Sequence, residues 1–226
     1  MESENRKGLT SAVKVIILFG VISLLGDMVY ESARGANSQY FNLLGVSATQ
    51  VGLVFGIGEF LGYFLRLLAG ILSDKSGRHW LFIFVGYGML LVVPFIGFAK
   101  NWNIMVVLIL AERIGKSLRN PAKDTILSGV AENQVGVGFA FGLQEALDQI
   151  GAFTGPLIFT FVFSIAGKSG IPEYRLSYKL LFIPFTLLMF FVSYVYRSIK
   201  RYSLLANVKT KEFHSERLKP VFWLYT

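Results

Sequence analysis

Charged side chains interrupt the most apolar stretches of this sequence, and their types and spacing could serve proton or substrate binding. Asp27, Glu31 and Arg34 recur at helical spacing and so share one face of a helix. A carboxylate in an apolar cavity is disfavoured in its charged form, so it can take up and release protons near neutral pH. The residues that we select for substrate binding or proton coupling are Asp27, Glu59, Arg113, Glu145 and Asp148.

The apolar stretches themselves are long enough to be membrane-spanning helices. Of the 226 residues, 54% are hydrophobic and 16% are charged, whereas a soluble domain usually has about a quarter of charged residues. A helix needs roughly 20 apolar residues to cross the hydrocarbon core, because each residue rises about 1.5 Å. The sequence therefore predicts an all-α membrane protein with six spans, at about 13–32, 48–73, 80–99, 103–128, 137–166 and 178–196.

The fourth span is the least apolar of the six, because Glu112 and Arg113 follow a short apolar core. Taken alone, it would be interpreted as a buried or re-entrant segment. Lys75 and Arg78 lie on the same side as the basic segment Arg197–Lys219 only if the fourth span crosses, and basic residues favour the cytoplasmic side. We therefore predict a multi-pass protein of the cell (cytoplasmic) membrane, embedded in the lipid bilayer with both termini in the cytoplasm.

The predicted spans also suggest how the chain is organised. Residues 1–196 would form the six-helix bundle, residues 197–219 a basic cytoplasmic linker, and residues 220–226 the start of a seventh span that is cut off. No small-residue cleavage site follows the first apolar run, so we expect no cleaved signal peptide. We interpret the chain as one half of a larger membrane protein.

Composition argues against several other classes of protein. The formal charge is +8, but the basic residues cluster beside apolar spans rather than in one extended patch, so we expect no nucleic-acid partner. There is no Cys, and His79 and His214 lie outside the apolar cores, so we expect neither a metal site nor a cofactor. No Ser-based catalytic constellation and no Walker-type phosphate loop occur, which argues against an enzyme and against ATP-driven pumping.

The segment between the second and third predicted spans carries the most specific motif. It runs Gly70-Ile-Leu-Ser-Asp-Lys-Ser-Gly-Arg-His79 and resembles the G-x-L-a-D-r-x-G-r-k loop of the major facilitator superfamily. Glycines permit a tight turn and a close approach of helices, and Asp74 can pair with a cationic group or a helix N-terminus. The alternative is an ordinary cytoplasmic turn. The residues that we assign to a loop used in conformational change are Gly70, Asp74, Gly77 and Arg78.

The fifth predicted span carries a second motif of the same superfamily. It is similar to a fifth-helix pattern that occurs mainly in proton-coupled exporters, although Phe159 and Thr160 replace the last two glycines of that pattern. Glycine and proline in a spanning helix could instead serve only packing and kinking. The residues that match the pattern are Gly142, Gly151, Gly155 and Pro156.

The resemblance covers nearly all of the chain and implies its architecture. Members of this superfamily have six helices arranged as two inverted three-helix repeats, and this bundle faces a second six-helix bundle across a central cavity. The second bundle would be a missing C-terminal half or another chain. In the fourth span, Arg113 is in register with the arginine of the family's R-x-x-x-G-x-x-x-A pattern.

Two explanations remain open for the charges near the bilayer centre. Counting about 1.5 Å per residue puts Glu59, Arg113 and Asp148 at that depth. They could form a structural ion pair, for example Arg113 with Asp148, or a site for protons or substrate. We predict half of a secondary active transporter that works by alternating access, with proton-coupled export of a small solute or drug-like compound. The alternative is a truncated or accessory membrane protein that does not transport.

Overall fold

The computed structural model describes residues 2–132 and 135–201 of the chain. Within these residues there are helices and short connections and no strand, so the predicted all-α class is confirmed. The predicted seventh span at 220–226, and the predicted linker from residue 202 onward, lie outside the described residues.

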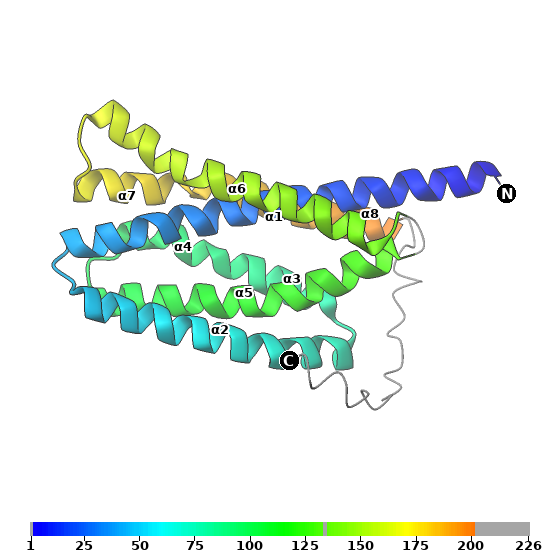
Figure 1. Ribbon diagram of the computed structural model, residues 1–226, viewed down its shortest axis with the longest axis horizontal. Helices are drawn as coiled ribbons and strands as arrows, with labels where there is room; N and C mark the ends of the chain where they lie inside the picture. Colours follow the sequence, from blue (N-terminus) through cyan, green and yellow to red (C-terminus); the bar gives the residue numbers. More distant parts are fainter. Residues whose placement is uncertain (1, 133–134, 202–226) are drawn as a thin grey trace, which may run out of the picture.

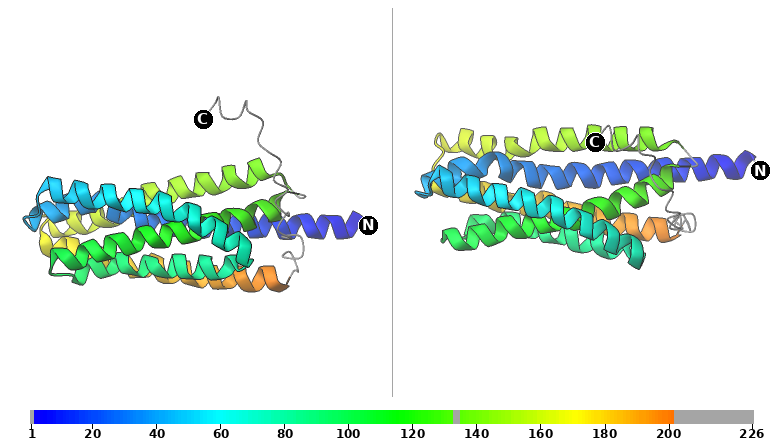
Figure 2. Two further views of the ribbon diagram at one scale, coloured as in Figure 1. Left: turned by 90° about the horizontal axis from the view of Figure 1, so that it is seen from below. Right: turned by 60° about the horizontal axis from the view of Figure 1, so that its bottom comes forward.

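The helices run side by side along the long axis of an elongated bundle (Figures 1 and 2). The connections at 44–47, 99–101 and 167–170 gather at one end, whereas the turn at 77–78 lies at the other (Figure 1). Two short 3-10 turns, η1 and η2, flank α4. The elements in order are α1 (Glu2–Leu43), α2 (Ala48–Ser76), α3 (His79–Gly88), η1 (Met89–Leu91), α4 (Val92–Phe95), η2 (Ile96–Phe98), α5 (Trp102–Ala131), α6 (Val137–Ala166), α7 (Ile171–Leu180) and α8 (Phe182–Arg201).

Five helical stretches among the described residues are long and apolar enough to cross a membrane. Two of them are composite: α3 to η2 form one continuous stretch, and α7 and α8 form another. Proline explains both irregularities, because Pro94 and Pro184 cannot donate a backbone hydrogen bond to the preceding turn. The five stretches are Ala12–Leu43, Ala48–Ser76, His79–Phe98, Val137–Ala166 and Ile171–Ile199.

Helix α5 has the length of a membrane span but carries too many charges to be counted with these five. It nevertheless lies within the bundle, packed against α2 and α3 (Figure 2). Its charged side chains point inward rather than outward: Glu112, Arg113, Arg119 and Lys123 are each at most 6% exposed. Burial of ionisable groups inside a bundle is typical of functional sites in membrane proteins.

Helix α1 is longer than its predicted span, which ends at residue 32. It continues to Leu43, because the residues after Ser32 still have an apolar face. Tyr40 and Phe41 are fully buried there, and Tyr40 stacks on Tyr174 of α7 with ring centroids 5.4 Å apart. Arg34 of the same helix is exposed and pairs with Glu31 at 3.2 Å.

The packing divides the bundle into two sets of helices. In the first set, α1 packs mainly against α6 and α8; in the second, α5 packs mainly against α2 and α3. The contact between α1 and α6 depends on glycine. A Cβ atom at Gly151 would collide with the carbonyl oxygen of Leu24, and one at Gly155 would collide with that of Met28. Small residues at such contacts let two backbones approach closely, as is common in membrane helices.

We expect Gly151→Ala to destabilise the protein by about 1–3 kcal/mol, because the new methyl group must push the two helix backbones apart. Gly142→Ala is the matched control in the same helix and the same motif, since a Cβ atom there meets no atom within 4 Å. The control should be neutral or slightly stabilising, because alanine favours helix more than glycine does. Thermal unfolding in detergent measures both variants. Equal melting temperatures for the two would contradict the close α1–α6 contact.

Candidate functional site

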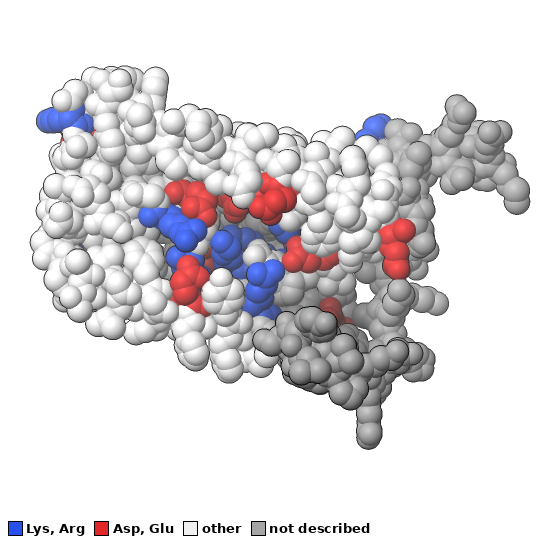
Figure 3. Space-filling view, in the orientation of Figure 1, with Lys and Arg blue, Asp and Glu red and all other residues white. Residues whose placement is uncertain are grey.

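The candidate site is built around a stripe of charged and polar residues on α5. Arg113, Lys116, Asn120 and Lys123 follow one another at intervals of three and four, so they lie along one face of the helix. This face is turned toward α1, α2 and α6, which contribute the other charged residues of the bundle interior. Figure 3 shows these Lys, Arg, Asp and Glu side chains in a hollow in the middle of a largely uncharged surface.

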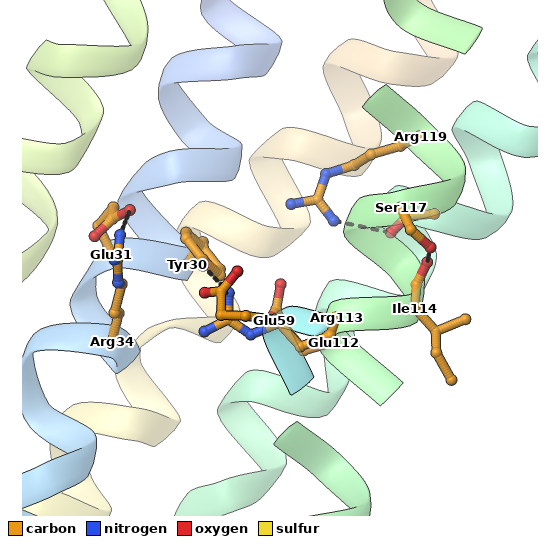
Figure 4. Close-up of polar contacts among 10 residues, drawn as sticks. Tyr30, Glu31, Arg34, Glu59, Glu112, Arg113, Ile114, Ser117 and Arg119 are labelled. Carbon is orange, nitrogen blue, oxygen red and sulfur yellow. Dashed lines mark hydrogen bonds and ion pairs between the residues drawn. The ribbon is translucent and has the colours of Figure 1, made fainter. Parts of the chain in front are cut away.

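Arg113 is the most connected of these residues and joins three helices. Its guanidinium forms an ion pair with Glu59 of α2 at 2.7 Å and another with Glu112 at 3.6 Å. It also donates a hydrogen bond to the hydroxyl of Tyr30 on α1. Figure 4 shows Glu59, Glu112 and Tyr30 converging on this guanidinium. A buried guanidinium with two carboxylates and a hydroxyl is well compensated for the loss of water.

A first cavity, which we call the Arg113 cavity, has a volume of about 400 Å³ and opens beside this ion pair. Its charge is unbalanced, because its wall contains one carboxylate, Glu59, and four cationic side chains. Lys116 lies above the ring of Tyr30, with its Nζ atom 3.7 Å from the ring centroid. The lining residues are Tyr30, Arg34, Glu59, Gly62, Tyr63, Arg66, Arg113, Lys116, Ser117 and Asn120.

A second cavity, the Asp148 cavity, has a volume of about 320 Å³. Arg66, Lys116 and Asn120 line both cavities, so the two adjoin. The cationic and acidic side chains of this cavity are equal in number, but few of them form ion pairs with one another. The cationic residues of its wall are Arg66, Lys116, Arg119 and Lys123, and the acidic ones are Asp27, Asp124, Glu145 and Asp148.

Most charges of the Asp148 cavity have partners other than an opposite charge. Lys123 donates to the hydroxyl of Ser23 at 2.8 Å, and Arg119 donates to the carbonyl of Gly86 at 3.4 Å. Arg66 and Asp124, at 3.5 Å, form the one ion pair among its described residues. The Oδ1 atom of Asp148 is buried without a hydrogen-bond partner. Carboxylates that face cations across a polar space can bind protons or a charged solute.

The structure thus brings all five selected site residues to the two cavities. Glu59 and Arg113 lie at the first cavity, and Asp27, Glu145 and Asp148 lie at the second. The suggested pair between Arg113 and Asp148 was wrong, because Arg113 instead pairs with Glu59 and Glu112. Which residue meets Arg113 depends on the rotation of each helix about its axis, and the sequence spacing does not determine that rotation.

Four further residues of the site were not selected from the sequence. Lys116, Arg119 and Lys123 follow Arg113 at helical spacing, and this periodicity was a usable signal. Lys123 lies toward the expected cytoplasmic end of its span, where basic residues are common for reasons of topology, whereas Lys116 lies near the middle of the predicted span 103–128. Tyr30 is the fourth of these residues: most aromatic residues of membrane proteins serve packing, but the hydroxyl and the ring of Tyr30 both contact cations.

The predicted conformational loop forms the turn between α2 and α3. Gly77 ends α2 in the left-handed conformation with φ 63°, and its N–H donates to the carbonyl of Ser73. Ser73 is buried and shares a hydrogen bond of 2.7 Å with His79, which lies 4.0 Å from the half-exposed Asp74. Arg78 is exposed. The loop is therefore held in place by the Ser73–His79 contact, and Asp74 remains accessible to other groups.

A bundle of apolar helices around a charged central hollow is the arrangement of membrane transport proteins, and comparison with known proteins identifies the family. The model of the Major Facilitator Superfamily matches residues 10–226, so the chain belongs to this family of membrane solute transporters. This confirms the family that the Gly70–His79 loop predicted.

Several relatives support the same conclusion. The chain is 42% identical over 163 residues to an uncharacterized protein of Mycobacterium tuberculosis, covering 72% of this chain and 40% of the relative. It is 32% identical over 154 residues to an uncharacterized MFS-type transporter of Methanocaldococcus jannaschii, and this match covers 68% of the present chain and 37% of the relative. It is 30% identical over 143 residues to the multidrug resistance protein MdtG of Proteus mirabilis, and this match covers 63% of the present chain and 34% of the relative. The match therefore spans less than half the length of each relative.

Double-mutant cycles on Arg113 test the geometry of the site. Arg113→Met should destabilise by about 3–5 kcal/mol, because it leaves Glu112 buried without its cation. The coupling free energy between Arg113→Met and Glu59→Gln should be about 0.5–1 kcal/mol. This value is low for two residues in contact, because the Glu59 side chain is 44% exposed. The coupling between Arg113→Met and Asp148→Asn should be within about 0.5 kcal/mol of zero. Unfolding in detergent measures both cycles, and a larger coupling with Asp148 would refute the assignment.

Proposed function

We propose that these residues form one half of a secondary active transporter that moves a small solute across the cell membrane by alternating access. The observation that carries the proposal is the charged hollow between α2 and α6, at the level where the buried charges of α5 lie. Ionisable residues at membrane depth normally line a pathway for solute or ions, because their burial in lipid is costly.

A second bundle is needed to close the hollow. Helices α2 and α6, which border it, are the least buried of the five apolar stretches. They expose large apolar side chains, including Phe60 and Phe64 of α2 and Phe153 and Phe161 of α6. We propose that part of this surface contacts a second six-helix bundle, in the same polypeptide or another one, and part contacts lipid. The greater length of the relatives agrees with this arrangement.

We further propose that α5 is a sixth span, that the helices form two inverted three-helix repeats, and that both termini lie in the cytoplasm. The alternation of the connections between the two ends of the bundle supports this topology (Figure 1). Lys75 and Arg78 at the α2–α3 turn then lie on the cytoplasmic side, as the distribution of basic residues requires.

Proton coupling is proposed to involve the carboxylates of the Asp148 cavity. Asp27 and Asp148 project from different helices, α1 and α6, into a space whose opposite wall carries Lys116, Arg119 and Lys123. Protonation of either aspartate would change its attraction to these cations, and so could bias the helices between two arrangements. Outward transport is supported by the match to the fifth-helix motif and by the name of the multidrug resistance relative.

The alternative function is that of a truncated or accessory membrane protein that lacks the second bundle. Reconstitution in liposomes distinguishes this alternative from the transporter, because a truncated or accessory protein would show no solute-dependent proton movement.

The proposed topology predicts the side from which each connection can be labelled. The chain contains no Cys, so single cysteines can be introduced without background. Thr49→Cys and Ser169→Cys should react with a membrane-impermeant maleimide from outside intact cells. Ser76→Cys should react only after the membrane is opened. All three positions are exposed in the structure, so failure to react cannot be ascribed to burial. Labelling of Ser76 and Ser169 from the same side would contradict the six-span bundle.

The proposed coupling predicts that Asp148→Asn abolishes proton movement. The complete protein would be reconstituted in liposomes that contain a pH-sensitive dye, and a panel of anionic, cationic and neutral organic solutes would be added. We expect solute-dependent proton flux in the unaltered protein and its loss in Asp148→Asn, because an amide cannot exchange the proton. Asp148→Glu, which keeps the carboxylate, is the matched control and should retain part of the flux. Unchanged proton flux in Asp148→Asn would remove Asp148 from the mechanism.

A further inference from the structure

We propose that the solute is a small organic anion, bound through a carboxylate or phosphate group by the cationic wall of the Arg113 cavity. This inference rests on the proposed transport function and adds the chemical class of the substrate. The cavity volume of about 400 Å³ lies in the range that small-molecule sites usually occupy.

The charge balance of the Arg113 cavity is the first argument. Four cationic side chains line it, and Glu59 is the single carboxylate among its lining residues. Glu59 is already engaged with Arg113 at 2.7 Å, so it is not available to bind a cationic solute without breaking that pair. Arg34 and Arg66 have acidic partners only at longer distances, with Glu31 at 3.2 Å and Asp124 at 3.5 Å, and both of these pairs are partly exposed.

Lys116 is the second argument, because it is the cation best placed to receive a ligand. It projects into both cavities. Among the residues that the structure describes, no carboxylate forms an ion pair with it, and its ammonium lies against the ring of Tyr30. A largely buried ammonium without a counterion is costly. An anionic group of the solute would supply the missing counterion.

The surroundings of Lys116 extend this positive region. Arg119 and Lys123 lie on the same helix and are almost fully buried, yet their described partners are a carbonyl, a tyrosine ring and a hydroxyl. Asp27 and Asp148 face them in the Asp148 cavity without forming an ion pair within the described residues. The α5 cations are therefore compensated mainly by dipoles, and the adjoining Arg113 cavity carries the excess of positive charge.

The polar residues beside the cations suit an oxyanion. Asn120 lines the cavity and carries an amide donor, whereas the Ser117 hydroxyl, which also lines the cavity, already donates to the carbonyl of Ile114. Tyr63 exposes its ring at the rim. Guanidinium groups bind carboxylate and phosphate oxygens in a two-pronged manner, whereas an ammonium acts as a point charge. Tyr30 and Tyr63 offer apolar faces for the organic part of the solute. The inside-negative membrane potential would add to the driving force for an outgoing anion.

The experiment uses a set of probes of equal shape and different charge. Benzoate, benzamide and benzamidinium would be titrated into the purified complete protein, held in nanodiscs of phosphatidylcholine, by calorimetry. Phenyl phosphate would test whether the site prefers phosphate, and nanodiscs with phosphatidylglycerol would test whether an anionic lipid occupies it instead. We expect benzoate or phenyl phosphate to bind and the neutral and cationic probes not to bind. If the anionic probes bind in phosphatidylcholine nanodiscs but not in nanodiscs with phosphatidylglycerol, the lipid headgroup is identified as the source of the oxyanion.

The variant Lys116→Gln should weaken binding of the anion about tenfold or more, since a charge-assisted contact is lost. Lys116→Arg should retain binding, and Lys168→Gln, which removes an exposed lysine in the α6–α7 connection, is the matched control. Melting temperatures of all variants establish that they fold. Preferential binding of benzamidinium, absence of anion binding at millimolar concentration, or unchanged affinity in Lys116→Gln would overturn the proposal. Anion binding without any flux in liposomes would instead uphold the site and contradict the transport function.

Discussion

The burial of the α5 charges is the constraint to which much of the bundle is adapted. A cation inside a membrane protein must find hydrogen bonds, counterions or water, because lipid supplies none of these. Arg113 meets this demand with groups from three helices: its neighbour Glu112, Glu59 of α2 and Tyr30 of α1. The same interactions that stabilise the guanidinium therefore fix the relative positions of α1, α2 and α5 around the hollow.

The two helix sets are joined by different kinds of contact. Within the first set, α1 and α6 meet along backbone and small side chains near Gly151 and Gly155. Between the sets, polar contacts are prominent, as in the hydrogen bonds from Arg113 to Tyr30 and from Lys123 to Ser23. The first kind of contact holds its helices through close packing of backbones, and the second holds because a buried polar group without a partner is costly. The hollow thus lies beside the polar contacts that join the two sets.

The sequence was sufficient for the class of protein and for five residues of the site, but not for the pairing of these residues or for the lysines beside them. Hydropathy and basic-residue bias predicted the apolar helices, and the Gly70–His79 motif identified the family. The choice of partner for Arg113 was wrong, because Glu59 and Asp148 sit at similar predicted depths and only helix rotation distinguishes them. Lys116 was overlooked because hydropathy treats each lysine alike, whether it snorkels to the surface or faces a cavity.

The contact between α1 and α6 has a mechanical consequence. Gly151 and Gly155 face the carbonyl groups of Leu24 and Met28, where a Cβ atom would collide. Sliding α6 by one turn would therefore bring Leu147 or Phe159 against these carbonyl groups. Such a step is sterically blocked, so the two helices keep a fixed register. The two helices can tilt together as one rigid body but cannot move past each other. Any motion that opens or closes the hollow must therefore move Asp27 of α1 and Asp148 of α6 together.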